Sequence, residues 1–227
     1  MQLEVQEARP ADIESAKAIY GPETGDLCAA SLGVGLAFSD SHDLETAKKR
    51  AEWSCQQQKD LLENDPTTRF LKVVDIDNND GIVAFGRWHR YPNGAQTVAD
   101  LETVGLKDRH DPATFPDGFR KDFYLGFLDE IGTARESWMG TGHCWVLTNV
   151  KTREPFQKKG AGSLVVKWGL EQAAAEGVPA YLESGMQAKG LYEKHGFREI
   201  GRHNVDCTSF GMPGVVIEIA RMKADPK

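Results

Sequence analysis

Residues 157–163 of this chain, Gln157-Lys158-Lys159-Gly160-Ala161-Gly162-Ser163, join a predicted strand at 144–150 to a predicted helix at 161–176. The strand residues are mostly apolar, and the helix carries apolar residues on one face. Two glycines let the backbone approach a ligand closely, and a helix N-terminus attracts anions. The segment therefore predicts an anion site suited to a pyrophosphate, although a tight turn entering a helix explains the same residues.

Two other phosphate-binding loops do not fit this segment. A P-loop has a lysine directly after its second glycine, whereas residues 162–164 are Gly-Ser-Leu. A dinucleotide-binding fingerprint has a third glycine and lies tight against its strand. Here position 165 is valine, and residues 151–159 separate the strand from the glycines. Both interpretations are therefore excluded.

Two further segments follow the predicted helix. Residues 181–184 are Tyr-Leu-Glu-Ser in a predicted strand, and residues 190–197 are Gly-Leu-Tyr-Glu-Lys-His-Gly-Phe. Together with the Gln-x-x-Gly-x-Gly run, they resemble the GNAT family of acetyltransferases, and small fungal members most of all. The close match covers about residues 144–201. The resemblance implies an α/β fold of the α+β type, with a mixed, mostly antiparallel central sheet flanked by helices.

The resemblance also implies roles for individual residues. Backbone groups of Val150 and Thr152 would bind the pantetheine arm and the acetyl carbonyl of acetyl-CoA. Tyr192 matches the family's tyrosine that hydrogen-bonds the CoA sulfur and protonates the leaving thiolate; a purely structural ring is the alternative. The residues expected to bind the pyrophosphate are Gln157, Lys158, Lys159, Gly160, Ala161, Gly162 and Ser163.

The implied activity is acetyl transfer from acetyl-CoA to a primary amine, by direct attack in a ternary complex. The amine must lose a proton, so a base or a water relay is needed. Glu183 is the carboxylate best placed by motif position, and the other candidates are His143, Asp100 and Glu102. The acceptor, a small-molecule or peptide amine, is not identified by the sequence. Two alternatives stay open: a catalytically silent acyl-CoA-binding module with a protein partner, and an acyltransferase for a longer acyl-CoA.

Hydrophobic periodicity and turn residues outline the rest of the chain. The expected strands are 3–9, 69–75, 82–88, 144–150, 179–184, 197–202 and 215–220, and the expected helices are 10–20, 43–64, 117–138, 161–176 and 187–195. The stretch from His89 to Pro116 is expected to be a surface connection, and Phe119, Phe123, Phe127 and Ile131 to form a core-facing stripe. We expect one domain over 1–227, with a cofactor-binding core at about 143–201 and an insertion at about 89–141 that shapes the acceptor side.

Composition limits the other possibilities. The 227 residues are 40% hydrophobic and 27% charged, which is typical of a globular protein. The net charge of −7 argues against general nucleic-acid binding, and no apolar run reaches the roughly 20 residues of a membrane span. Four cysteines without a Cys-x-x-Cys pair and six histidines without ligand spacing predict reduced thiols and no metal site. We expect a cytoplasmic monomer or homodimer.

Overall fold

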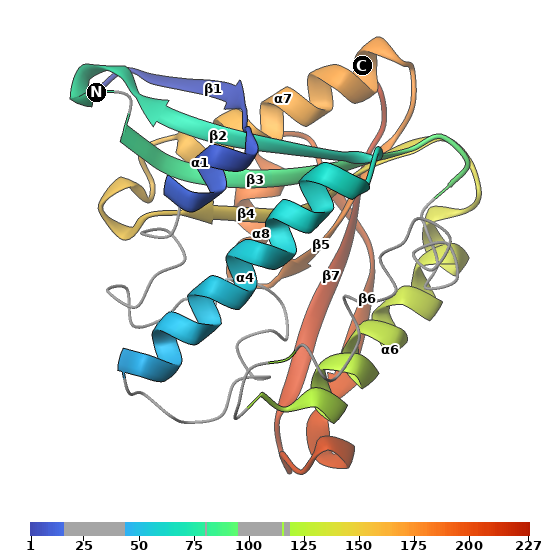
Figure 1. The fold of residues 1–227 in the computed structure, drawn as a ribbon. Coiled ribbons are helices and arrows are strands. Elements are labelled where there is room, and N and C mark those ends of the chain that lie inside the picture. The colour runs from blue at the N-terminus through green and yellow to red at the C-terminus, as the bar shows by residue number, and fades with distance from the viewer. Residues whose placement is uncertain (16–43, 80, 95–114, 116–118) are drawn as a thin grey trace.

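The computed structural model describes residues 1–15, 44–79, 81–94, 115 and 119–227 (Figure 1). Seven strands among them form one sheet in the order β1-β2-β3-β4-β5-β7-β6. The strands are β1 (Leu3–Glu7), β2 (Thr68–Asp75), β3 (Gly81–Tyr91), β4 (Cys144–Thr152), β5 (Ala180–Gly185), β6 (Arg198–Asp206) and β7 (Val216–Ala224). Only β4 and β5 pair in parallel. The expected mixed, mostly antiparallel sheet is confirmed.

Helices lie on both faces of this sheet (Figure 1). The helices of the described residues are α1 (Pro10–Ser15), α4 (Leu44–Asn64), α6 (Lys121–Met139), α7 (Ala161–Ala175) and α8 (Lys189–Glu193). α7 packs on one face, where its apolar side joins the largest core cluster. α4 covers the opposite face of β2 and β3. Its Trp53 packs against Phe119, just before α6, and against Tyr124, within α6. α4 and α6 therefore share the face opposite α7.

α7 approaches β3 closely because two glycines leave room. A Cβ on Gly169 would lie 2.0 Å from Cε2 of Trp88, and a Cβ on Gly86 would lie 2.2 Å from Cγ1 of Val165. Either contact is shorter than real Cβ atoms tolerate, so neither position accepts a side chain without a shift of its neighbours. The helix is thus held tightly against the centre of the sheet.

The expected core-facing stripe on α6 is confirmed. Its members Phe119, Phe123, Phe127 and Ile131 are buried together with residues of β6 and β7, among them Val205 and Ile219. α6 lies within the segment expected to be an insertion, between β3 and β4 in the chain. It therefore adds a helix over the β5–β7–β6 part of the sheet.

The structure differs from the expectations in strand length. β3 continues through Tyr91, so residues 89–91 are strand rather than surface connection. They pair with the first residues of β4 and lie partly or fully buried. β6 and β7 each extend four residues beyond their expected ends, because the two strands pair with each other from Arg198 opposite Lys223 to Asp206 opposite Val216. The expectations for residues 16–43 and 95–114, including Cys28, Asp100 and Glu102, lie outside the described residues.

Candidate active site

The two parallel strands in the middle of the sheet separate partway along. β4 and β5 pair only from Trp145 opposite Ala180 to Leu147 opposite Leu182. β4 nevertheless continues to Thr152 and β5 to Gly185. Main-chain groups on the β5-facing side of residues 148–152 therefore have no strand to pair with, and such groups require a partner. The sheet opens here between two central strands, which suits an extended ligand with amide groups.

The loop after β4 leads to an exposed helix N-terminus. Lys158 and Gly160 have positive φ angles of 59° and 97°, which turn the chain sharply into α7. Gly160 is the N-cap of α7 and provides no side-chain cap, so the first N–H groups of the helix stay open. A Cβ on Gly160 would meet no heavy atom within 4 Å, so there is space beside this turn. Open N–H groups at a helix N-terminus favour an anion, and the turn leaves space beside them.

The expected cofactor-binding residues come together at one point. A Cβ on Gly162 would lie 3.4 Å from Cδ2 of Leu191, 3.6 Å from Cγ1 of Val150 and 3.8 Å from Oγ1 of Thr152. The end of β4, the first turn of α7 and helix α8 therefore meet at Gly162. The amide of Gln157 also donates to the carbonyl of Thr152 at 3.3 Å, which ties the loop to the strand end.

Positive charge gathers beside this turn. Lys158 and Lys159 are exposed, and the Lys159 ammonium lies 5.7 Å from the ring centroid of Phe156. The guanidinium of Arg153 lies 6.0 Å from the same ring. These cations suit a phosphate group bound at the start of α7.

Tyr192 lies on α8, directly after Leu191. Its ring is 9% exposed and packs edge-on against Phe197 at 6.1 Å. Burial disfavours the phenolate and raises the pKa of Tyr192 to about 12, so the hydroxyl keeps its proton at neutral pH. No residue of the described chain forms a hydrogen bond with this hydroxyl. Tyr192 is thus a protonated donor without an acceptor in the part of the chain that the structure describes.

Glu183 is the first residue of β5 beyond its last pair with β4. Nε and Nη2 of Arg135 on α6 both donate to its Oε2, at 2.9 and 2.5 Å. The Glu183 side chain is only 8% exposed, yet its Oε1 has no hydrogen-bond partner among the described residues. Burial disfavours the charged guanidinium, but Glu183 outweighs that effect and raises the pKa of Arg135. The ion pair keeps one carboxylate oxygen occupied and leaves the other open.

Sequence reasoning missed Arg135. It lies 48 residues before Glu183, and no local motif marks it. An isolated arginine on a helix gives no sign of which strand it will meet. Only the packing of α6 across β5 brings the two side chains together.

His143 lies at the opposite end of β4. Its Nε2 is 2.8 Å from Oε2 of Glu176, at the C-terminal end of α7. Arg90 also pairs with Glu176, at 2.9 Å. The nine residues of β4 begin directly after His143 and end at Thr152, so His143 does not suit a base acting at the opening.

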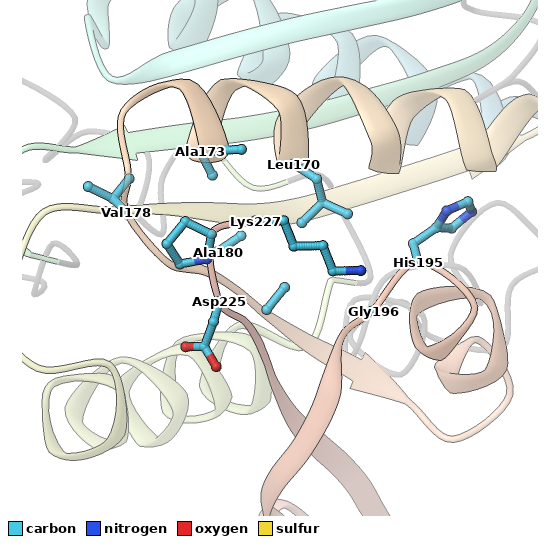
Figure 2. Close-up of a pocket in the computed structure, with 11 residues that line it drawn as sticks. Leu170, Ala173, Val178, Ala180, His195, Gly196, Asp225 and Lys227 are labelled. Carbon is cyan, nitrogen blue, oxygen red and sulfur yellow. The ribbon is translucent and has the colours of Figure 1, made fainter.

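A small hollow lies away from the opening, between the second half of α7 and the C-terminal residues (Figure 2). Its volume is about 70 Å³, room for only about two water molecules. Leu170 and Ala173 form one wall, and Figure 2 shows Lys227 between them and His195. The hollow is too small for a cofactor.

A metal-binding cluster and a membrane-spanning helix are both absent from the described residues. No group of three His, Cys, Asp or Glu side chains there could hold a metal ion. None of the helices described is both long and apolar enough to cross a membrane.

Comparison with known proteins identifies the family. The model of the acetyltransferase (GNAT) family matches residues 38–197, well over half of the chain. None of the curated proteins matches.

Solved structures share the fold at low sequence identity. A histone acetyltransferase HPA2-related protein of Corynebacterium glutamicum has a TM-score of 0.58 and 16% identity, covering 100% of this chain and 98% of its own. Arabidopsis thaliana NAA60, in complex with a bisubstrate analogue, has a TM-score of 0.54 and 12% identity. The match covers 100% of this chain and 99% of the NAA60 chain. A phosphinothricin acetyltransferase of Sinorhizobium meliloti, in complex with acetyl-CoA, has a TM-score of 0.54 and 13% identity. The match covers 100% of this chain and 89% of the Sinorhizobium chain. The chain belongs to the GNAT acetyltransferase family.

Proposed function

We propose that this protein is an acetyl-CoA-dependent N-acetyltransferase that acts on a primary amine in a ternary complex. The observation that carries the proposal is the opening between β4 and β5, directly beside the uncapped first turn of α7. Solved relatives that contain acetyl-CoA or a bisubstrate analogue support the cofactor and the ternary complex.

The residues of the opening fit CoA. Unpaired backbone groups near Val150 and Thr152 would bind the amides of the pantetheine arm. The N–H groups of residues 158–163 would bind the pyrophosphate, with Lys158 and Lys159 adding positive charge. Gly160 leaves the space that the phosphates need.

When bound, acetyl-CoA supplies the thioester that is attacked. The amine nitrogen forms a bond to the carbonyl carbon, and the carbon–sulfur bond breaks. Glu183 accepts the proton of the amine through its open oxygen, and backbone N–H groups of β4 stabilise the developing oxyanion. Tyr192 donates its proton to the leaving sulfur, for which its raised pKa keeps it ready at neutral pH.

The acceptor is a small-molecule or peptide amine. It would enter from the face that α4 and α6 share, since Glu183 points to that face through Arg135. The insertion between β3 and β4 would shape this side, within a single domain that spans the chain.

A thermal-shift titration with acetyl-CoA tests the proposal, with desulfo-CoA and ADP as comparators. A ligand at 100 times its Kd adds about 2.7 kcal/mol, which raises Tm by roughly 5–10 °C for a chain of this size. Thiol release with a panel of amines then measures transfer.

The outcomes separate the alternatives. A Tm shift with turnover of at least one primary amine supports the proposal. A shift without turnover of any amine would indicate a silent binding module. Turnover with longer acyl-CoA but not with acetyl-CoA would indicate a different acyltransferase. An unchanged Tm at millimolar acetyl-CoA would remove the cofactor from the proposal altogether.

A further inference from the structure

Asn149 lies at the point where β4 leaves β5. It is the second residue after Leu147, the last residue of β4 that pairs with β5. On its other side it pairs with Arg87 of β3, so the two side chains point to the same face of the sheet. Arg87 contacts Gln58 of α4 at 3.1 Å, which identifies that face as the one opposite α7.

The side-chain carbonyl oxygen of Asn149 is unsatisfied. Its Oδ1 is buried and has no hydrogen-bond partner. Neighbouring polar groups bond elsewhere: Nε of Arg87 donates to Oγ1 of Thr148 at 2.9 Å, and that hydroxyl donates to the carbonyl of Arg87 at 3.2 Å. A buried amide without a partner in a native fold calls for an explanation, and a ligand that supplies the partner is one.

Across the opening, Glu183 presents a second open acceptor to the same face. Its Oε2 takes both bonds from Arg135, which lies on α6, and its Oε1 takes none within the described part of the chain. The last pair between β4 and β5 is Leu147 with Leu182, and paired strands lie about 4.8 Å apart. Asn149 and Glu183 come shortly after these two residues, one on each strand. Two hydrogen-bond acceptors therefore flank the opening, one on each strand.

We propose that Asn149 is a positioning residue for the acceptor amine: its Oδ1 accepts one N–H of a primary amine while Oε1 of Glu183 accepts the other. This proposal rests on the proposed function, and it names a side chain that holds the amine substrate. A neutral primary amine has two N–H bonds and one lone pair. Holding both N–H bonds from opposite strands leaves the lone pair for the thioester carbon. A secondary amine has one N–H and satisfies only one of the two acceptors, so the pair also selects primary amines.

Substitution by leucine separates this role from a structural one. Asn149→Leu keeps the side-chain size but removes the amide, whose Oδ1 accepts no hydrogen bond from the residues that the structure describes. Loss of an unsatisfied buried polar group is neutral or stabilising for the fold. We therefore expect an unchanged or raised Tm, an unchanged Kd for acetyl-CoA, and a ten- to hundredfold lower kcat/KM for the amine. Asn149→Asp keeps an acceptor oxygen and is expected to recover part of the lost activity.

The measurement uses the panel amine with the highest turnover and its N-methyl derivative. The wild type is expected to prefer the primary amine at least tenfold, and Asn149→Leu to lose most of that preference. The matched control is Asn204→Leu, at an exposed position on the edge strand β6, which should change none of these values.

Several results would overturn the assignment. A kcat/KM in Asn149→Leu equal to that of the wild type would show that the amide does not hold the amine. A weaker Kd for acetyl-CoA with an unchanged amine preference would assign Asn149 to the pantetheine arm instead. The proposed function is tested separately on the wild type. If the wild type binds no acetyl-CoA or acetylates no amine, the proposed function is wrong, and the assignment of Asn149 is wrong with it.

Discussion

The indole N–H of Trp88 donates to the main-chain carbonyl of Val165 at 3.0 Å, which joins the centre of β3 to the second turn of α7. Trp88 is fully buried, so this bond satisfies the one polar atom of its ring. The first turn of α7, where we propose the anion site, comes directly before Val165. The Trp88 contact therefore fixes the anion site relative to the strands that open beside it.

Gly169→Ala is expected to destabilise the fold by about 2–3 kcal/mol, because the new methyl group collides with the rigid ring of Trp88. Urea unfolding measures the change. Gly190→Ala is the control, since a Cβ there meets nothing within 4 Å. Equal stability of Gly169→Ala and the wild type would mean that α7 is not packed as closely as the structure has it.

Gly162→Asp is expected to weaken acetyl-CoA binding at least a hundredfold, because it places a carboxylate where β4, α7 and α8 meet. Gly162→Ala adds a methyl group at ordinary contact distances and no charge, so its affinity should fall less than tenfold. Calorimetry on both folded variants gives the Kd values. Similar affinities for the two variants would contradict the anion site.

Tyr192→Phe is expected to lower kcat tenfold or more while the Kd for acetyl-CoA changes less than threefold, since only the proton donor is lost. Burial raises the pKa of Tyr192 to about 12, so the wild-type hydroxyl stays protonated through pH 10. The wild-type rate should therefore show no loss from Tyr192 ionisation between pH 7 and 10. Stopped-flow thiol release against pH tests both statements, and an unchanged kcat in the variant would remove Tyr192 from the chemistry.

Asp65 provides a pH-dependent part of the stability. Its burial would raise the pKa of its carboxyl group, but hydrogen bonds from His89, Thr67 and Thr68 outweigh burial and lower that pKa below its usual range. A carboxyl group with a lowered folded-state pKa stabilises the fold above the unfolded pKa of about 3.9, and the contribution is lost as pH falls further.

Asp65→Asn is therefore expected to cost about 3 kcal/mol at pH 7, and this difference from the wild type should shrink below pH 4. Urea unfolding at pH 7 and pH 3 measures it. Glu63→Gln is the control, because Glu63 is exposed at the end of α4, just before Asp65. A difference that stays constant with pH would contradict the role of the carboxylate.

Local sequence patterns predicted the turn at Gly160 and the helix after it, and both are confirmed. Gly160 and Gly162 need only their neighbours in the chain to form a turn at a helix N-terminus, so a short motif suffices. The four-residue spacing of Phe119, Phe123 and Phe127 likewise predicted which face of α6 is buried.

Contacts between distant segments were not predictable in this way. The sequence predicted a surface connection that includes His89 and Tyr91, yet both residues are buried in β3. His89 is buried because Asp65 and Thr68, on a neighbouring segment, bond its ring. Arg135 and Glu183 form a pair for the same reason, since only the packing of α6 on β5 decides their contact. Such partners depend on the fold as a whole rather than on spacing in the chain.

The opening between β4 and β5 creates a third strand edge, in addition to the outer edges at β1 and β6. Exposed edges invite strands of other chains and so favour aggregation. This inner edge is bounded by strands on both sides, and near Leu147 it begins at a single strand spacing of about 4.8 Å. At that point a foreign strand has no room to enter between β4 and β5. Strands of neighbouring molecules therefore cannot reach this edge from the end where β4 and β5 are paired.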